Sequence, residues 1–275
     1  MTKTAGTTLE ALLKRDRLIV VGGLVSVVLL AWIYILLGAG MGMSAFEMTA
    51  MSAKPQGMSM AMDMMKPMAW SAGTALVMFF MWWIMMIAMM LPSAAPMILL
   101  YAAVNRKQAA RGNPVAPTGL FAAGYLVVWG GFSLIATGLQ WALERAELLS
   151  AMMVSTSIAL GAGLLIAAGI WQLTPLKHAC LKHCRSPIDF LAHHWRKGRW
   201  GAFRMGLGHG AFCLGCCWFL MALLFYGGVM NLYWIVGLAL YVLIEKMIPV
   251  GHRLLGNGAG LLLIAWGGWL LIDLI

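Results

Sequence analysis

The sequence predicts an all-α, polytopic bundle of transmembrane helices with about seven spans. Of the 275 residues, 62% are hydrophobic and only 10% are charged, and the mean hydropathy is +0.87. Several apolar runs reach about 20 residues, the length that an α-helix needs to cross the hydrocarbon core. Helices are expected because each span must satisfy its own backbone hydrogen bonds in lipid. The alternation typical of membrane strands does not occur in these runs.

The predicted spans follow one another along a single membrane domain, residues 1–275. They cover residues 18–37, 69–91, 119–143, 153–173, 202–228, 232–248 and 254–274. The second span is expected to continue past Pro92 and Pro96 with a kink, because proline removes a backbone donor. Two longer polar segments lie between spans. We expect residues 38–68 to form an external loop and residues 174–201 to form a cytoplasmic loop.

The basic residues predict the orientation of the bundle. With the N-terminus in the cytoplasm, 16 of the 19 Lys and Arg residues fall in inside segments, and only Lys54, Lys66 and Arg145 fall outside. This asymmetry is the positive-inside pattern, so we expect the N-terminus inside and the C-terminus outside, in a bacterial inner membrane. The net charge of +10 is then explained by anchors beside anionic headgroups, and the expected partner is the lipid bilayer, with no nucleic acid.

The segment 38–68 is rich in methionine, with ten thioethers in 31 residues. Its Met-x-Met repeats include Met58, Met60, Met62 and Met64. A thioether is a soft, neutral ligand that suits Cu(I) and needs no deprotonation. The segment also contains lysine, serine and glycine, so we interpret it as a site of copper capture. The alternative is that methionine serves as a flexible apolar filler.

A second group of methionines lies in the second predicted span. Met78, Met81, Met85 and Met89 are spaced by three and four residues, which places them on one helix face. Such a row can pass Cu(I) inward. Packing is the preferred interpretation, because methionine at helical spacing is commonly a core residue.

Cysteine and histidine are concentrated in the segment from His178 to Trp218. This segment contains all five cysteines and five of the six histidines. Thiolate and imidazole are ligands of copper, zinc and iron–sulfur clusters. The candidate metal ligands are His178, Cys180, His183, Cys184, His209, Cys213, Cys216 and Cys217.

Spacing divides these candidates into two groups. Met205, His209, Cys213 and Cys216 are separated by four, four and three residues, so one helix stripe presents them together. Cys180 and Cys184 share a face if their segment is helical. Four thiolates suit tetrahedral Zn(II), and fewer suit Cu(I), which is the preferred metal. An iron–sulfur cluster is a further alternative, and simple packing is the alternative for a cysteine within a span.

Glu245 is a candidate because a carboxylate near the inner end of a span is costly unless it is paired or faces a polar cavity. It can neutralise a bound cation or relay a proton. The alternative is an ion pair with Lys246 or Arg253.

Four stretches together resemble a known family. They are HACLKHCRSP (178–187), GHGAFCLGCCW (208–218), WWIMMIAMMLPSAAPM (82–97) and EKMIPVG (245–251). The chain resembles the bacterial predicted metal-binding integral membrane proteins, a domain of unknown function. The resemblance covers the chain from the second span onward and does not account for the methionine-rich segment. It implies metal binding in a membrane protein and no particular activity.

Two functions from different classes follow. The preferred one is copper binding, transport or delivery, with a membrane cuproenzyme as a candidate recipient. The alternative is an accessory or assembly subunit of a larger membrane complex with a structural zinc site. We expect no enzymatic activity, because no carboxylate dyad, phosphate-cradling loop or nucleophile motif is found.

The predicted orientation is testable with reporter fusions. A reporter placed after Gly57 and another at the C-terminus are both expected on the external face, because both segments follow an odd number of spans. Activity of paired periplasmic and cytoplasmic reporters measures this. A cytoplasmic signal from either position would contradict the orientation.

Overall fold

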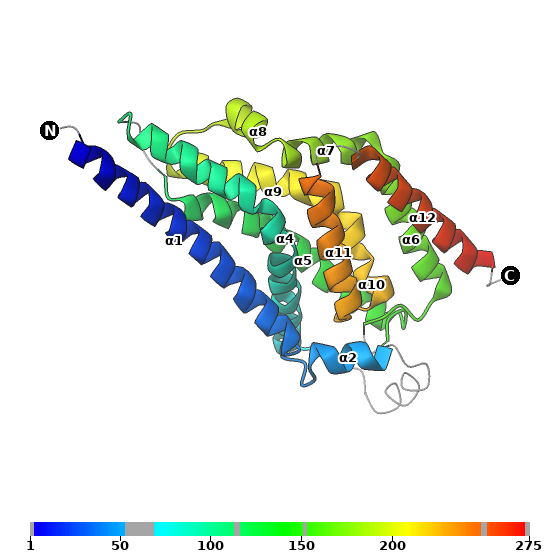
Figure 1. Ribbon diagram of the computed structural model, residues 1–275. Helices are drawn as coiled ribbons and strands as arrows, with labels where there is room; N and C mark the ends of the chain where they lie inside the picture. Colours follow the sequence, from blue (N-terminus) through cyan, green and yellow to red (C-terminus); the bar gives the residue numbers. More distant parts are fainter. Residues whose placement is uncertain (1–2, 53–68, 113–115, 151–152, 249–251, 273–275) are drawn as a thin grey trace.

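The computed structural model of the chain describes residues 3–52, 69–112, 116–150, 153–248 and 252–272. Within these residues the structure is helical, and its one β feature is a single bridge between Leu149 and Ser155. The prediction of an all-α fold is therefore confirmed. The helices (Figure 1) are α1 (Lys3–Leu36), α2 (Ala45–Ser52), α4 (Ala72–Ala109), α5 (Thr118–Arg145), α6 (Ile158–Leu173), α7 (Pro175–Arg185), α8 (Pro187–His194), α9 (Gly198–Ala222), α10 (Leu224–Gly227), α11 (Leu232–Met247) and α12 (His252–Ile272).

Each of the seven predicted spans contains a helix, but the helices differ in length. Among the described residues, five are long and apolar enough to cross a membrane: 17–36, 72–109, 118–145, 198–227 and 253–272. α6 and α7 together make a sixth candidate, bent by 66° between them. α11 has 16 residues, or about 24 Å at 1.5 Å per residue, which is less than the roughly 30 Å hydrocarbon core. The count of seven and the orientation stay predictions.

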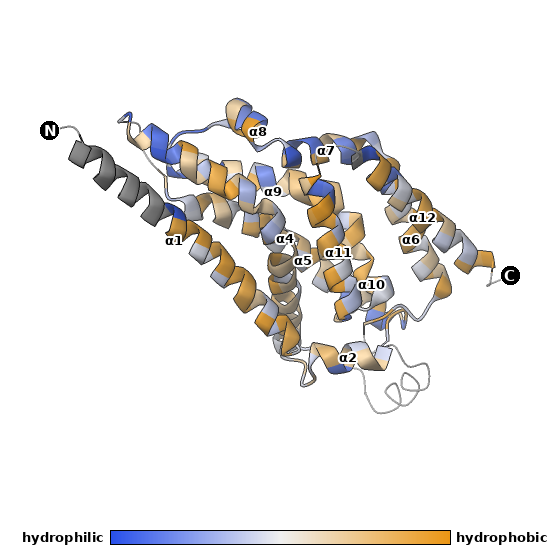
Figure 2. Ribbon diagram, viewed as in Figure 1, coloured by the Kyte–Doolittle hydropathy of each residue, from blue (hydrophilic) through white to orange (hydrophobic). Residues whose placement is uncertain are grey.

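The two ends of the bundle differ in character. Figure 1 places α2 at one end, and the first residues of α1 with α7 and α8 at the other; these are called the α2 end and the α7 end below. Figure 2 shows that α7 is largely hydrophilic and that the described part of α1 is mainly hydrophobic. On α1, Leu18 and Leu30 are 70% and 65% exposed. Such exposure of large apolar side chains suits a surface in contact with lipid.

α4 is the longest helix and carries Pro92 and Pro96 in its interior. It is bent in Figure 1, as expected for a helix in which two residues lack a backbone donor and clash with the carbonyl four residues earlier. Beside the prolines, the carbonyl of Met90 accepts hydrogen bonds from Ser93 Oγ (2.8 Å) and from Tyr125 OH (3.2 Å). The second bond ties the bend of α4 to α5.

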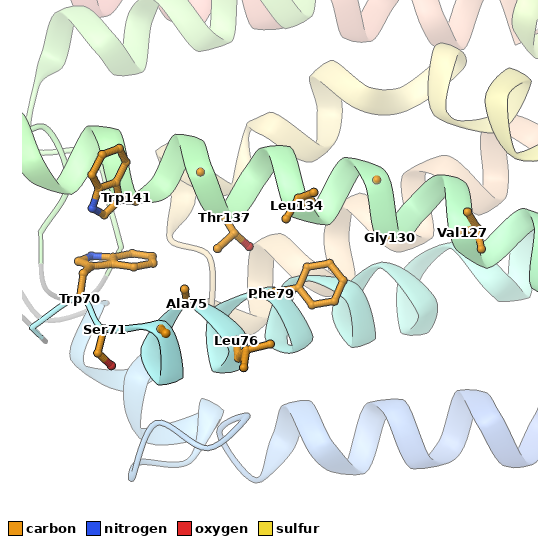
Figure 3. A pocket seen from close by; sticks show the side chains of 13 residues that line it. Trp70, Ser71, Ala75, Leu76, Phe79, Val127, Gly130, Leu134, Thr137 and Trp141 are labelled. Atoms are coloured by element: carbon orange, nitrogen blue, oxygen red, sulfur yellow. The ribbon is translucent and has the colours of Figure 1, made fainter.

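A groove opens on the outer surface of α4 and α5 toward the α2 end. Its volume is about 940 Å³. Figure 3 shows Trp70 and Trp141 at one end of the groove, with Phe79 and Leu134 along its sides. The lining is almost entirely apolar, so this surface is suited to contact with lipid chains.

α5 and α9 approach each other so closely that two glycines are required. A Cβ atom on Gly206 would lie 2.0 Å from the carbonyl oxygen of Phe121, and one on Gly124 would lie 2.3 Å from that of Phe203. Small residues at facing positions allow two membrane helices to pack backbone to backbone. This contact sets the cysteine-bearing α9 against α5.

The Gly206→Ala variant is expected to lose about 1–3 kcal/mol of stability, because the added methyl group must push the two helices apart. Gly131→Ala is the matched control on α5, since its Cβ would meet nothing within 4 Å; it is expected to be neutral or to gain up to about 1 kcal/mol. Thermal unfolding of the protein in detergent measures both. Equal midpoints for the two variants would contradict a backbone contact at Gly206.

Candidate metal centre

Residues 174–201, expected as a loop, form α7, α8 and the first turn of α9. Thr174 caps α7, because its side chain accepts a hydrogen bond from the backbone N–H of Lys177 at 3.3 Å, and Pro175 occupies the first turn, where its missing donor costs nothing. The helix ends before Pro187, which disfavours a helical conformation at Ser186. The buried side chains of α7 are Lys177, Leu181 and Cys184.

Four thiols gather where α7 packs on α9. Cys184 of α7 interacts with the thiols of both Cys213 and Cys216, and Cys217 interacts with the same two. All four cysteines are buried, and all five cysteines of the chain are free. The structure therefore brings Cys184 next to the cysteines of α9, while a single metal site formed by these residues stays a prediction.

Cys180 lies at the edge of this group. It is half-buried, and its sulfur lies against the backbone of α9: a Cβ on Gly215 would be 2.8 Å from Cys180 Sγ. It is also close enough to Cys216 for the two to interact electrostatically. Cys180 is thus the most accessible thiol of the five.

The thiols are not arranged as a finished coordination sphere. Cys216 Sγ and Cys217 Sγ both donate to the carbonyl oxygen of Cys213, each at 3.0 Å. Within the described part of the chain, no three side chains of His, Cys, Asp or Glu are placed to hold a metal ion. Because the thiols point to a helix carbonyl, ligation requires that they lose their protons and rotate.

A buried cation adjoins the thiols, and sequence reasoning missed it. Lys246 Nζ donates to Cys213 Sγ and to Ser93 Oγ, both at 3.0 Å. Tyr125 OH lies 3.1 Å from the same sulfur. From the sequence, Lys246 is expected only as a partner for Glu245. In the structure, the ammonium group of Lys246 instead points to the thiols. The centre therefore contains a positive charge that can balance thiolates.

Glu245 has a different partner from the two expected. It forms a buried ion pair with Lys177 of α7 instead of with Lys246 or Arg253. Tyr241 OH donates to Glu245 Oε1 at 3.3 Å, and Gln172 Nε2 donates to Tyr241 OH at 2.9 Å. The reason is geometric, because adjacent residues on a helix point about 100° apart. Glu245 therefore faces α7 while Lys246 faces α9.

The histidines are spread over several surfaces. His209 is buried one turn before Cys213, stacks on Tyr125 with ring centres 5.8 Å apart, and has no hydrogen-bond partner for Nδ1. His183 stacks on Phe212 at 4.1 Å, and its Nδ1 lies 2.9 Å from the carbonyl oxygen of Ala179. His178 contacts Asn257 of α12. His209 is close enough to Cys213 and Cys216 to interact with them electrostatically, whereas His178 and His183 face other partners.

The methionine predictions have two outcomes. Met58, Met60, Met62 and Met64 lie outside the described residues, so copper capture there stays a prediction. The row on α4 is described, and all its members are buried. A flanking residue, Met90, joins that helix to the thiols, because Cys217 Sγ lies 3.9 Å from Met90 Sδ.

These features define a class of protein: a helical bundle with membrane-length helices and a buried group of free thiols next to a cation. The chain belongs to the PpoB2 family, described as a copper chaperone family, whose model matches residues 79–270. The matched range contains the thiols and their partners on α4, α5, α7, α9 and α11, and it leaves out α1 and α2. This match confirms the expectation of a metal-binding family in its coarser form, as a copper-related family, whereas membership of a bacterial membrane-protein family stays a prediction. No curated protein and no solved structure gives a significant match.

Glu245→Gln is expected to cost about 3–5 kcal/mol, because it leaves the buried ammonium group of Lys177 without a counter-charge. The double variant Lys177→Met/Glu245→Leu should lose less, since it removes both charges together. Asp189→Asn is the control: this exposed residue of α8 should change stability by no more than about 0.5 kcal/mol. Thermal unfolding in detergent measures all three. A double variant that is less stable than Glu245→Gln would contradict the argument.

Proposed function

We propose that this protein is a membrane-embedded copper chaperone that binds Cu(I) at the thiols of Cys184, Cys213 and Cys216, with Cys217 adjacent. The observation that carries the proposal is the convergence of Cys184, from α7, on the cysteine stripe of α9. Cysteine sulfur is a soft ligand that suits Cu(I). Membership of the copper chaperone family supports the choice of metal.

Charge balance favours Cu(I) over zinc at this place. A Cu(I) ion held by two of these three thiols as thiolates, with the third still protonated, carries a net charge of −1, and the ammonium group of Lys246 beside Cys213 brings the sum to zero. A zinc ion with four thiolates carries −2, which Lys246 only halves. Because uncompensated charge is costly in a buried site, a two-coordinate Cu(I) centre is the better fit. The nearest described carboxylate, that of Glu245, is already paired with Lys177.

A route for copper delivery is suggested by the difference in solvent accessibility among the thiols. Cu(I) moves between sulfur ligands by exchange, in which an incoming thiolate binds before the outgoing one leaves. Cys180 is half-buried at the α7 end and lies next to the buried Cys216. We assign Cys180 the role of exchange thiol, through which copper reaches a recipient such as a membrane cuproenzyme. The protein then acts by binding and transfer, without catalysing a reaction, in a bacterial inner membrane.

The Cys213→Ser/Cys216→Ser variant is expected to lose its bound copper while the protein remains folded and inserted. Elemental analysis of copper, zinc and iron in the purified protein measures this, together with competition against a Cu(I)-specific chelator. Because thiols must lose protons to bind metal, wild-type affinity should fall as the pH is lowered. Zinc in the wild-type protein, in place of copper, would instead favour a structural site in a larger complex.

Cys180→Ser separates binding from delivery. This variant is expected to keep the copper content of the wild type, because Cys184, Cys213 and Cys216 remain. It should transfer copper to a thiol-bearing acceptor about tenfold or more slowly, a typical effect of losing a group that supports a metal site. Loss of copper content in this variant would place Cys180 among the primary ligands and contradict its assignment as the exchange thiol.

A further inference from the structure

The methionines in the first part of α4 all lie on the buried side of the helix. Between its first residue and Pro92, the helix carries six methionines, and every one is buried: Met78, Met81, Met85, Met86, Met89 and Met90. The large apolar residues that this part of α4 exposes are Leu76, Val77 and Phe80. If only hydrophobicity mattered, methionine and leucine would be interchangeable between the two sides. The difference between the buried and exposed sides therefore shows that thioethers are gathered on the inside of the bundle.

The row of methionines ends at the thiol centre. Met86 and Met90 are four residues apart and share a face of α4, and Met90 Sδ is 3.9 Å from Cys217 Sγ. Cys217 in turn interacts with Cys213 and Cys216. Sulfur atoms thus lie next to one another from α4 into the proposed copper site.

The opposite end of the row meets a polar network near the α2 end. Gln140 Nε2 donates to Met78 Sδ at 3.5 Å and to Glu144 Oε1 at 2.9 Å. Its Oε1 accepts from Trp82 Nε1 at 2.8 Å, and Trp70 Nε1 donates to Glu144 Oε2 at 2.6 Å. Glu144 is only partly buried, so a carboxylate reachable from the surface lies one residue away from the first thioether. A cation is attracted to such a group.

We propose that the α4 methionines form a transfer path that carries Cu(I) between the Glu144–Gln140 network and the thiol centre. Met78 and Met90 are separated by about 18 Å along the helix at 1.5 Å per residue, which is more than half of a hydrocarbon core of roughly 30 Å. The proposal rests on the proposed function, since it requires that the thiols bind Cu(I). It adds an activity, movement of the ion across the bundle.

Each step along the path is a ligand exchange. A bond from Cu(I) to the next thioether forms as the bond to the previous one breaks, and the metal stays in the same oxidation state. Thioethers are neutral, so no proton moves until the ion reaches the cysteines, where a thiol releases one proton per thiolate formed. A soft monovalent ion suits this thioether lining, whereas Mg²⁺ and Ca²⁺ prefer oxygen ligands and Zn²⁺ is bound by thiolate, imidazole or carboxylate groups.

The test uses the full-length protein in liposomes that contain a membrane-impermeant, chromogenic Cu(I) chelator. Cu(I), kept reduced with ascorbate, is added outside, and colour formation inside gives the transfer rate. Met85→Leu removes one sulfur from the path at nearly constant volume. Met97→Leu is the matched control, since Met97 is equally buried on the same helix but lies beyond the prolines and outside the row. Copper content of each purified variant is measured separately in detergent.

Met85→Leu is expected to transfer copper about tenfold more slowly than the wild type, the lower end of the effect of losing a supporting group of a metal site. Met97→Leu is expected to transfer copper at the wild-type rate. Copper content should be unchanged in both variants. Equal transfer rates for the two variants would show that the methionines only pack, and would overturn the path. If the wild-type protein binds copper but no colour forms inside the liposomes, the transfer path is also overturned, while the chaperone function stands. Wild-type protein that binds no Cu(I) would overturn the proposed function itself.

Discussion

Two adjacent charged residues on α11 hold the centre of this protein together. A charge buried in an apolar helical bundle requires a counter-charge or hydrogen-bond partners, and Glu245 and Lys246 have theirs on different neighbouring helices. Glu245 pairs with Lys177 and so fixes the start of α7 to α11. Lys246 bonds Cys213 and Ser93, and so connects α11 to α9 and α4. The relative placement of Cys184 and the α9 thiols depends on both contacts.

Under the proposed function, the same arrangement accounts for metal binding by buried thiols. Four cysteines in an apolar interior behave as small hydrophobic groups while they are protonated. Beside the ammonium group of Lys246, however, thiolates formed on metal binding have a counter-charge already in place. Under the proposed function, copper uptake would require proton release and side-chain rotation but no large movement of the backbone, because the helices that carry the sulfurs are already in contact.

Sulfur-bearing side chains extend from α4 to the α7 end of the bundle. Thioethers line the inside of α4, the Met90–Cys217 contact links them to the thiols, and the half-buried Cys180 lies at the α7 end. Neutral thioethers occupy the apolar middle, and thiols, which would need deprotonation to bind a metal, occur beside a cation. This order follows the electrostatic cost of each ligand type in its surroundings, and it gives a physical basis for linking binding with transfer.

The sequence by itself determined the class of fold and the set of candidate ligands. Apolar runs of membrane length and the 3.6-residue period were enough to predict a helical bundle, the bend in α4 and the stripe of His209, Cys213 and Cys216, because these depend on local covalent geometry. Only the tertiary structure decided that α7 is a helix whose Cys184 faces that stripe, that Glu245 pairs with Lys177, and that Lys246 and Tyr125 contact Cys213. These contacts join residues tens of positions apart, and they depend on which side of each helix faces its neighbour, which no local pattern specifies.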